Sequence, residues 1–225
     1  RHMSLDVLIP HYCDPAGLAK SVASVVEQDW TGDIRIVVVD DGSPESVYRK
    51  VKALMDDQPL PFTLDRNPEN RGRPYTRNRL LDSIDSDFVA WLDADDVWYP
   101  SKLNQQFEHI NRLRFAGEDI ERMWVTCNYD WQREGARCYQ VDQVVEGDQL
   151  LKLFLGQELR CYLWTLLGTA KSFRTVGPFD ERLPRLQDVD FFVRFVRAGG
   201  ILTKPPYRKA LCRYYKSDVG RSAHE

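Results

Sequence analysis

The segment IRIVVVDDGSP, residues 34–44, carries the strongest structural signal in this sequence. Its first six residues form a continuous run rich in β-branched side chains, which is typical of a strand covered on both faces. The run leads into Asp40-Asp41-Gly42-Ser43-Pro44, a cluster of turn-forming residues. A buried strand followed by a turn and a helix indicates one unit of an α/β sheet.

The segments on either side repeat this alternation. Residues 5–9 are an apolar run that ends at Pro10, and residues 16–26 carry apolar side chains at helical spacing. Further along, the sequence predicts a helix at 47–54, a weak strand at 62–64, a loop at 67–74, a helix at 75–84 and a strand at 88–92. Strands that alternate with helices imply right-handed crossovers and a mostly parallel sheet.

The second half of the chain is less regular. Helical patterns occur at residues 102–113, 147–155 and 189–198, and strand-like runs at 124–131, 162–167 and 207–215. Because no repeat, low-complexity tract or linker divides the sequence, we expect a single domain.

Length and composition describe an ordinary globular protein. The 225 residues suffice for one sizeable α/β domain. A hydrophobic content of 43% and a charged content of 29% exclude a disordered chain. The net charge of −3 provides no basic field, so we expect no nucleic-acid partner.

Cysteine usage and hydropathy bear on the compartment. The five cysteines are scattered without a CxxC pair, which indicates reduced thiols rather than a zinc site or a disulfide framework. The most apolar stretch, residues 161–170, is about half of the ~20 residues that a membrane span requires. We therefore expect a cytoplasmic protein, with peripheral association at the inner membrane face left open.

The densest acidic cluster is Asp93-Ala94-Asp95-Asp96, directly after the predicted strand at residues 88–92. Three carboxylates this close repel one another unless a cation or hydrogen-bond donors compensate them. Hard cations such as Mg²⁺ take carboxylates together with substrate phosphates as ligands. An acidic turn capping a helix near Pro100 is the alternative. Because ligands bind beyond the carboxyl ends of parallel strands, this cluster and Asp40-Asp41 mark the expected site.

Three further features allow both a structural and a functional interpretation. Asp40-Asp41-Gly42-Ser43 suits a helix-capping turn, or a carboxylate that accepts from a base or ribose. The arginines of Asn70-Arg71-Gly72-Arg73 and Arg77-Asn78 suit a solvated surface, or contacts to nucleotide and phosphate oxygens. Asp188 suits a helix N-cap, or a general base that takes a proton from a hydroxyl.

Six motifs in a fixed order form a more specific signal than any one of them. They are Val7-Leu8-Ile9-Pro10-His11-Tyr12, Val39-Asp40-Asp41-Gly42-Ser43, Asn70-Arg71-Gly72 with Arg77-Asn78, Asp93-Ala94-Asp95-Asp96, Gly177-Pro178-Phe179-Asp180-Glu181 and Gln187-Asp188. In this order they resemble the motifs of family 2 inverting glycosyltransferases with the GT-A fold. The resemblance spans residues 5–215, nearly the whole chain.

This resemblance implies an α/β fold of the GT-A type, with a Rossmann-like, mostly parallel sheet flanked by helices and a smaller mixed region on the acceptor side. Residues 4–98 would form the nucleotide-sugar-binding half of a single domain. Residues 99–215 would form its acceptor-binding and catalytic half, and we expect residues 216–225 to be a flexible tail.

The resemblance also implies individual roles. Asp188 matches the catalytic base, and Asp96 matches the ligand of a Mn²⁺ or Mg²⁺ ion that bridges the diphosphate. Asp95 would face the ribose or the metal, while Asp93 is the outer and least defined member of the acidic motif. The residues implied to contact the nucleotide are Pro10, Tyr12 and Asp41 around the base, with Arg71 and Arg77 at its border.

The sequence departs from the family pattern at four positions. Cys13 stands where Asn is common, and Thr76 replaces a small Ala. Gln187 replaces a Glu before the base, which removes one negative charge beside Asp188 and is expected to lower its pKa. The histidine of the usual closing loop is absent, and Lys216 stands nearby as a possible diphosphate contact in its place.

The implied activity is that of a hexosyltransferase-like enzyme in glycan or polysaccharide synthesis. A nucleotide-sugar, UDP-linked by default, would donate to a hydroxyl of a glycan, lipid-linked or protein acceptor. A sugar-nucleotide nucleotidyltransferase is one alternative, but His11–Pro15 stands where that class carries a Gly-rich loop. A non-catalytic nucleotide-binding domain is the other, and the presence of Asp96 and Asp188 argues against it.

Overall fold

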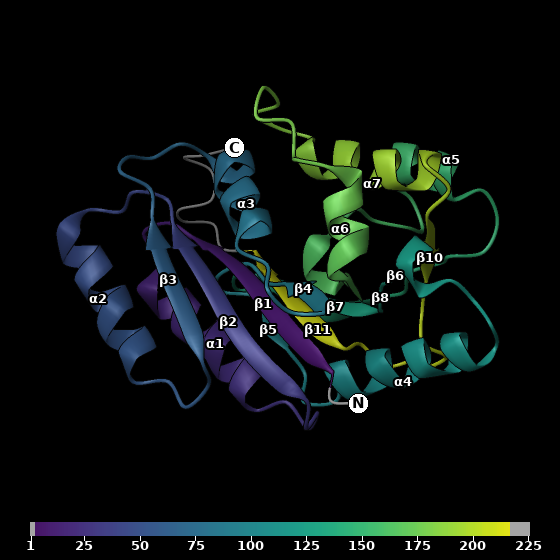
Figure 1. Cartoon of the computed structure of the whole chain (residues 1–225), viewed down its shortest axis with the longest axis horizontal. Helices are drawn as coiled ribbons and strands as arrows, with labels where there is room; N and C mark the ends of the chain where they lie inside the picture. The colour runs from purple at the N-terminus through teal and green to yellow at the C-terminus, as the bar shows by residue number, and fades with distance from the viewer. Residues whose placement is uncertain (1–2, 217–225) are drawn as a thin grey trace.

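The computed structural model describes residues 3–216, which form two β-sheets with helices packed around them (Figure 1). The larger sheet is mostly parallel, because only β9 runs antiparallel to its neighbours. Its spatial order is β10 (Ile201–Thr203), β6 (Met123–Val125), β9 (Leu167–Thr169), β4 (Phe88–Trp91), β1 (Ser4–His11), β2 (Asp33–Asp40) and β3 (Phe62–Arg66).

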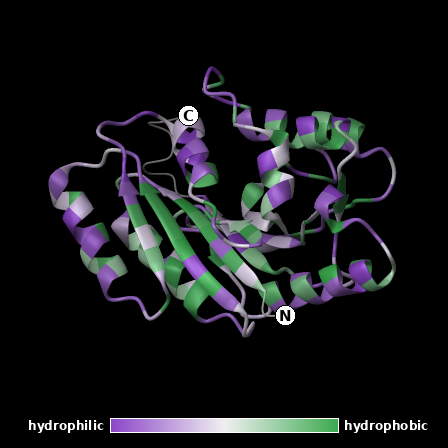
Figure 2. Ribbon diagram, viewed as in Figure 1, coloured by the Kyte–Doolittle hydropathy of each residue, from purple (hydrophilic) through white to green (hydrophobic). Residues whose placement is uncertain are grey.

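The central strands are apolar on both faces, as the sequence predicts. Along β1, Leu5, Val7 and Ile9 belong to one core and Leu8 to the other. Helices therefore cover both faces of the sheet, whose strands are largely green in Figure 2. On the first face lie α1 (Pro15–Val26), α2 (Glu45–Asp56) and α4 (Lys102–Phe115), and on the second α3 (Arg73–Asp82), α5 (Gln149–Leu155), α6 (Ala170–Val176) and α7 (Gln187–Arg197).

Local sequence sets where several helices begin. The Asp14 side chain accepts a hydrogen bond from the backbone N–H of Gly17 at 3.0 Å, and Pro15 opens α1. Thr169 caps α6 in the same way by accepting from the N–H of Ser172 at 3.1 Å. These caps satisfy N–H groups that have no partner within the helix.

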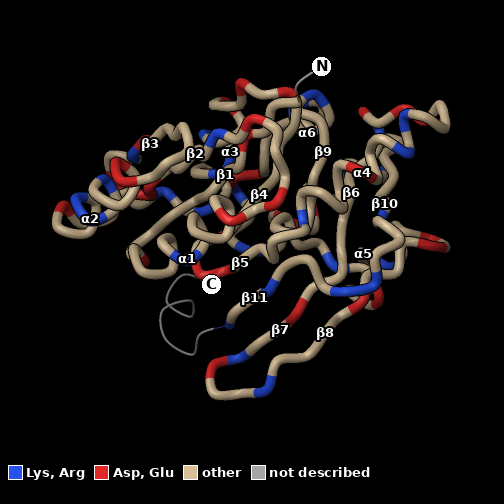
Figure 3. The backbone as a smooth tube through the Cα atoms, turned by 90° about the horizontal axis from the view of Figure 1, so that it is seen from below, with Lys and Arg blue, Asp and Glu red and all other residues tan. Residues whose placement is uncertain are grey.

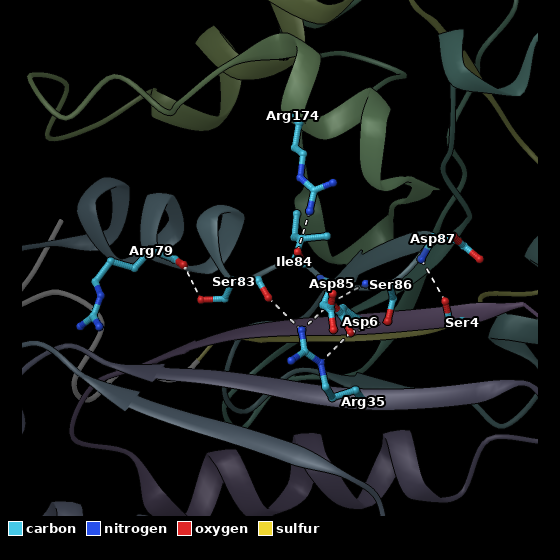
Figure 4. A network of polar contacts seen from close by, with 10 residues as sticks. All are labelled: Ser4, Asp6, Arg35, Arg79, Ser83, Ile84, Asp85, Ser86, Asp87 and Arg174. Atoms are coloured by element: carbon cyan, nitrogen blue, oxygen red, sulfur yellow. Dashed lines mark hydrogen bonds and ion pairs between the residues drawn. The ribbon is translucent and has the colours of Figure 1, made fainter.

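A buried carboxylate ties the amino ends of the central strands together (Figure 4). Arg35 donates two hydrogen bonds to Asp6, at 2.9 and 2.8 Å, and Ser86 Oγ donates a third at 2.6 Å. Burial raises the pKa of Asp6, but these donors outweigh it and hold the pKa below its ordinary value. The network links β1, β2 and the loop before β4, far from the carboxyl ends of the strands.

The smaller sheet belongs mainly to the second half of the chain. Its order is β5 (Val97–Trp98), β11 (Cys212–Lys216), β7 (Tyr129–Arg133) and β8 (Tyr139–Val141). β11 returns the chain to β5, directly after the acidic motif. The core on the first face runs from Leu5 to Cys212, so both halves contribute to it. Of the tail predicted at residues 216–225, Lys216 ends β11 and residues 217–225 lie outside the described residues.

Three strand predictions in the second half are wrong in extent. The run at 124–131 is two strands in different sheets, because the Asn128 side chain leaves the ladder to bind the N–H of Gln143 at 2.8 Å. The run at 162–167 is mostly a 3₁₀ turn, in which the Thr165 hydroxyl donates to the carbonyl of Tyr162 at 2.7 Å. In the run at 207–215, only the part within β11 is a strand.

Charged residues of both signs are interspersed over the described part of the chain, without a broad single-sign region on the tube (Figure 3). Within residues 3–216, no helix combines the length and the apolar composition that crossing a bilayer would require.

Candidate active site

The carboxyl ends of β1, β2 and β4 meet at one edge of the larger sheet. β1 pairs in parallel with β2, where His11 lies opposite Asp40, and with β4, where Leu8 lies opposite Trp91. The loop after β1 (residues 12–14, called the first loop), the turn at Asp41 and the acidic motif therefore lie close together at this edge. Ligands bind at this edge in such sheets.

A buried hydrogen-bond network that the motifs did not reveal holds the first loop. His11 Nδ1 lies 2.8 Å from Asp40 Oδ1, and His11 Nε2 accepts from the N–H of Asp14 at 2.9 Å, which places the ring proton on Nδ1. Ser43 Oγ donates to Asp40 at 2.7 Å and accepts from the N–H of Cys13 at 3.0 Å. Burial raises the pKa of Asp40, but these donors together lower it. His11 and Asp40 end neighbouring strands and lie opposite each other. Their positions at the two strand ends were the sequence signal from which this contact could have been predicted.

Asp41 fixes the loop that leads to α3. Its carboxylate accepts from Asn67 Nδ2 at 2.8 Å and from the N–H groups of Arg71 and Gly72 at 2.7 and 3.0 Å. The preceding turn requires Gly42, because a Cβ there would lie 2.3 Å from the backbone of Glu69 and φ is +72°. The predicted contact between Asp41 and a base adds to this structural role and stays a prediction.

The other residues predicted to border the nucleotide lie around the same edge. Pro10 and Tyr12 are half-buried at the end of β1. Arg71 is exposed, and its guanidinium lies 4.5 Å from the centre of the Tyr75 ring. Contact of Pro10, Tyr12 and Arg71 with a nucleotide stays a prediction.

The acidic motif forms a tight turn against the start of α1. Ser21 Oγ lies 3.1 and 2.7 Å from the carbonyl oxygens of Asp93 and Asp96, and its one proton is best placed to be donated to the nearer, that of Asp96. Asp95 has φ +79°, in the left-handed region, and its Oδ1 lies 3.6 Å from Lys20 Nζ. Asp96 is buried, and its Oδ1 accepts from the N–H of Tyr215 at 3.1 Å. Lys216, the next residue, therefore ends β11 beside this motif.

Arg77 occupies a different place from the one expected of a residue at the nucleotide border. Its guanidinium is only 2% exposed and forms ion pairs with Asp188 and, at 3.4 Å, with Asp93. Burial opposes the charge of Arg77, but the two carboxylates outweigh it and raise the pKa. Arg77 thus links the acidic motif to a residue 111 positions away in the sequence. A direct nucleotide contact by Arg77 stays a prediction.

Asp188 is the second residue of α7 and keeps 32% of its side chain exposed. Although Arg77 opposes the shift, the surrounding protein atoms and the charge of Asp93 raise the pKa of Asp188. A carboxylate with a raised pKa is a better proton acceptor at neutral pH. It faces a cavity of about 420 Å³, into which a hydroxyl can enter. A larger hollow of about 870 Å³ lies around Phe88, at the amino end of β4 and away from these carboxylates.

The described residues contain no cluster of three or more His, Cys, Asp or Glu side chains poised to hold a metal ion. Asp95 and Asp96 are adjacent oxygen donors at the strand end. This donor set suits a hard divalent cation that takes one or two carboxylates and completes its shell with phosphate oxygens and water.

The fold and the site together define a Rossmann-like α/β protein with a carboxylate-rich site at the carboxyl edge of its sheet. Residues 6–157, more than half of the chain, match the family model described as Glycosyl transferase family 2. The chain belongs to this family.

Two curated relatives illustrate the similarity. The succinoglycan biosynthesis protein ExoW of Rhizobium meliloti is 38% identical over 112 residues, covering 48% of this chain and 34% of ExoW. The amylovoran biosynthesis glycosyltransferase AmsB of Erwinia amylovora is 25% identical over 205 residues, covering 88% of this chain and 66% of AmsB. The chain thus spans only part of the length of the curated relatives it matches.

Solved structures support the GT-A fold. TarS of S. aureus, residues 1–349 in complex with UDP-GlcNAc, superposes with a TM-score of 0.75 at 17% identity, covering 99% of this chain and 61% of that one. The mannosyltransferase PcManGT of Pyrobaculum calidifontis, in complex with GDP-Man and Mn²⁺, gives a TM-score of 0.67 at 17% identity, covering 100% of this chain and 59% of that one. At this identity the likeness establishes the fold alone.

Proposed function

We propose that this chain transfers a hexosyl group from a nucleotide-sugar to an acceptor hydroxyl with inversion at the anomeric carbon. The observation that carries the proposal is Asp188, a partly exposed carboxylate of raised pKa that faces a cavity and is linked through Arg77 to the acidic motif. In this proposal residues 4–98 bind the donor and residues 99–215 supply the acceptor side and the base.

The donor would lie over the carboxyl ends of β1, β2 and β4. Pro10 and Tyr12 would line one side of the base, Asp41 would accept from it, and Arg71 would border the nucleotide. Asp41 already accepts three hydrogen bonds, and an ionised carboxylate has about four acceptor sites, so one remains for the base. The UDP-GlcNAc complex of TarS and the GDP-Man complex of PcManGT support a nucleotide-hexose donor.

Asp96, with Asp95, would hold a Mn²⁺ or Mg²⁺ ion together with the donor diphosphate. The oxygen donor set fits such a hard cation, and Mn²⁺ in PcManGT supports the assignment. When bound, the cation would act as a Lewis acid that stabilises the charge of the departing diphosphate. Lys216, beside the acidic motif at the end of β11, would add a second positive charge near that group.

Asp188 would carry out the proton transfer. Its carboxylate accepts the proton of the acceptor hydroxyl while that oxygen forms a bond to the anomeric carbon. The bond from the anomeric carbon to the diphosphate oxygen breaks on the opposite face, and the nucleoside diphosphate leaves with the bonding electron pair. Arg77 keeps the carboxylate in place and ionised before the transfer, because it offsets the charges of Asp93 and Asp188.

The names of ExoW and AmsB support a role in polysaccharide biosynthesis. The rival activity, nucleotidyl transfer, has less support. That class carries a Gly-rich loop after the first strand, whereas here β1 ends at His11, whose ring is hydrogen-bonded in the buried network with Asp40. Incubation with a sugar phosphate and a nucleoside triphosphate, with detection of pyrophosphate, tests that rival.

The direct test is the substitution Asp188→Asn, with Asp190→Asn as the matched control. Asp190 lies on the same helix but pairs with Arg194 at 3.0 Å, outside the site. We expect D188N to lower the rate of UDP release from a UDP-sugar with acceptor by about 10²–10⁴-fold. The thermal shift caused by UDP and Mn²⁺ should persist in both variants. Retained transfer in D188N would refute the assignment.

A further inference from the structure

The cavity beside Asp188 is lined by more basic than acidic side chains. Besides Asp188, the charged side chains on its wall are Arg73, Arg160 and Arg185. Its volume of about 420 Å³ is within the range of roughly 300–1,000 Å³ that is typical of small-ligand pockets. Tyr162 and Leu153 add apolar surface on which a sugar ring can pack.

Two of these arginines, Arg73 and Arg160, are exposed to solvent and lack a carboxylate partner among the described residues. The one acidic group on the wall, Asp188, is already paired with Arg77, which lies behind it. Neither Arg73 nor Arg160 forms an ion pair with any residue in the described range 3–216. The charge of Arg73 lowers the pKa of Asp188, and the charge of Arg160 lowers the pKa of Cys161. Both arginines therefore act electrostatically on residues of the cavity wall.

The cavity wall also carries a neutral amide, that of Gln187, beside the catalytic-base candidate. Gln187 lines the cavity and is 7% exposed, and its Oε1 has no hydrogen-bond partner among the described residues. A carboxylate at this position would repel an anion from the cavity, whereas the neutral amide does not. The unpartnered atom, Oε1, is an acceptor, so a hydroxyl group of a ligand would complete its bonding.

We propose that this cavity takes an anionic acceptor, a sugar that carries a carboxylate or a phosphate close to its reacting hydroxyl. The inference rests on the proposed function, because it uses Asp188 as the base. The occupant of a cavity with the base on its wall is the molecule whose hydroxyl that base deprotonates, which is the acceptor rather than the donor. Arg73 and Arg160 are the specificity-determining residues, since guanidinium groups bind carboxylates and phosphates through paired hydrogen bonds.

The test measures binding of matched probes to the full chain saturated with UDP and Mn²⁺. The probes are methyl β-D-glucoside, methyl β-D-glucuronide and glucose 6-phosphate, titrated by ligand-observed NMR at low ionic strength. We expect at least one charged probe to bind about tenfold or more tightly than the neutral glucoside. The stronger of the two charged probes identifies the source of the anion as a carboxylate or a phosphate.

The variants Arg73→Gln and Arg160→Gln should each reduce this preference by about tenfold, while the affinity for UDP stays unchanged. Arg137→Gln is the control, because Arg137 is an exposed arginine between β7 and β8, outside the cavity. Equal or undetectable binding of the charged probes, or a preference that survives both variants, overturns the inference. Competition of a charged probe with the UDP-sugar but not with UDP would place the anion on the donor and would also overturn it.

The same experiment separates this inference from the proposed function. If UDP with Mn²⁺ binds but charge preference is absent, only the anionic acceptor is refuted. If no nucleotide binds the wild-type chain with a divalent cation, the proposed transfer itself is refuted.

Discussion

Replacing Arg77 by methionine tests whether one buried cation holds the site together. The side chain is 2% exposed, packs 5.7 Å from the centre of the Phe179 ring, and is ion-paired with two carboxylates from distant segments. Methionine keeps most of the volume and the apolar packing but removes the charge. Asp93 and Asp188 then face each other without compensation.

The expected loss of stability follows from the two ion pairs. At an effective dielectric constant of 20, unit charges 4 Å apart attract by about 4 kcal/mol, so two pairs would give about 8 kcal/mol. Asp93 and Asp188 are 23% and 32% exposed, and solvent screening reduces that sum by roughly half. Removal of the buried Arg77 Nε, which has no hydrogen-bond partner among the residues that the structure describes, offsets about 1 kcal/mol. The net cost of about 3 kcal/mol agrees with the usual cost of breaking a buried pair.

Urea unfolding followed by tryptophan fluorescence measures this cost as a midpoint lower by about 1 M. The penalty should shrink at acidic pH. Burial raises the pKa of Asp188 even beside Arg77, and without that cation the pKa rises further, so protonation removes the uncompensated charge as the pH falls. Arg182→Met is the control, since this 89% exposed arginine forms a surface pair with Asp180. An Arg77→Met cost below 1 kcal/mol, or one independent of pH, would refute this account.

The remaining predictions concern other parts of the chain. Asp6→Asn should destabilise by about 3 kcal/mol at pH 7, measured by urea unfolding, because it breaks the buried pair with Arg35. Since the folded pKa of Asp6 is lowered, this contribution is full above the unfolded value near ~3.9 and is lost as the pH falls through the folded value. Gly42→Ala should lower the melting temperature and weaken UDP binding, since its φ is +72° and its Cβ would meet the Glu69 backbone; unchanged UDP affinity would contradict this. A thiol reagent should titrate two cysteines rapidly in the native chain, and the buried pair only after unfolding; the fast pair is Cys13 and Cys138, and the slow pair is Cys127 and Cys212.

The first half of the fold was predictable because its signals are local. Its central strands are self-contained apolar runs followed by turn residues, and only the strand at 62–64 had a weak signal. The second half was harder, because short strands depend on their partners rather than on their own sequence. Residues 124–131 were predicted as one strand, yet they belong to two sheets, with Asn128 between them bound to Gln143. No local pattern reports a contact to Gln143 or to Lys204.

The place of the predicted site residues in the fold was easier to predict than their contacts. The alternation of strands and helices put Asp41 and Asp96 after the carboxyl ends of parallel strands, where the structure has them, and a ligand at this edge stays a prediction. The partners of Arg77 lie 16 and 111 residues away in the sequence, and motifs alone do not predict contacts over such separations. One signal was nonetheless present: Arg77 lies on the same helical stripe as Pro74, Leu80 and Leu81, all buried in α3. A charged residue on an apolar stripe must be paired.

The distribution of charge divides the site into an acidic part and a basic part. Asp93 and Asp188 share the single positive charge of Arg77, and Asp95 lies 3.6 Å from Lys20, so the acidic part holds more carboxylates than cations. Under the proposed function, a divalent cation would offset this excess and hold the donor diphosphate. Arg73 and Arg160 have no carboxylate partner within the described chain. Both arginines are exposed to solvent, so the folded chain is stable without an anion, and their guanidinium groups remain available to one that enters the cavity. The proposed cation on the acidic side of Asp188 and the proposed anion on its basic side would each match the charge of the residues beside them.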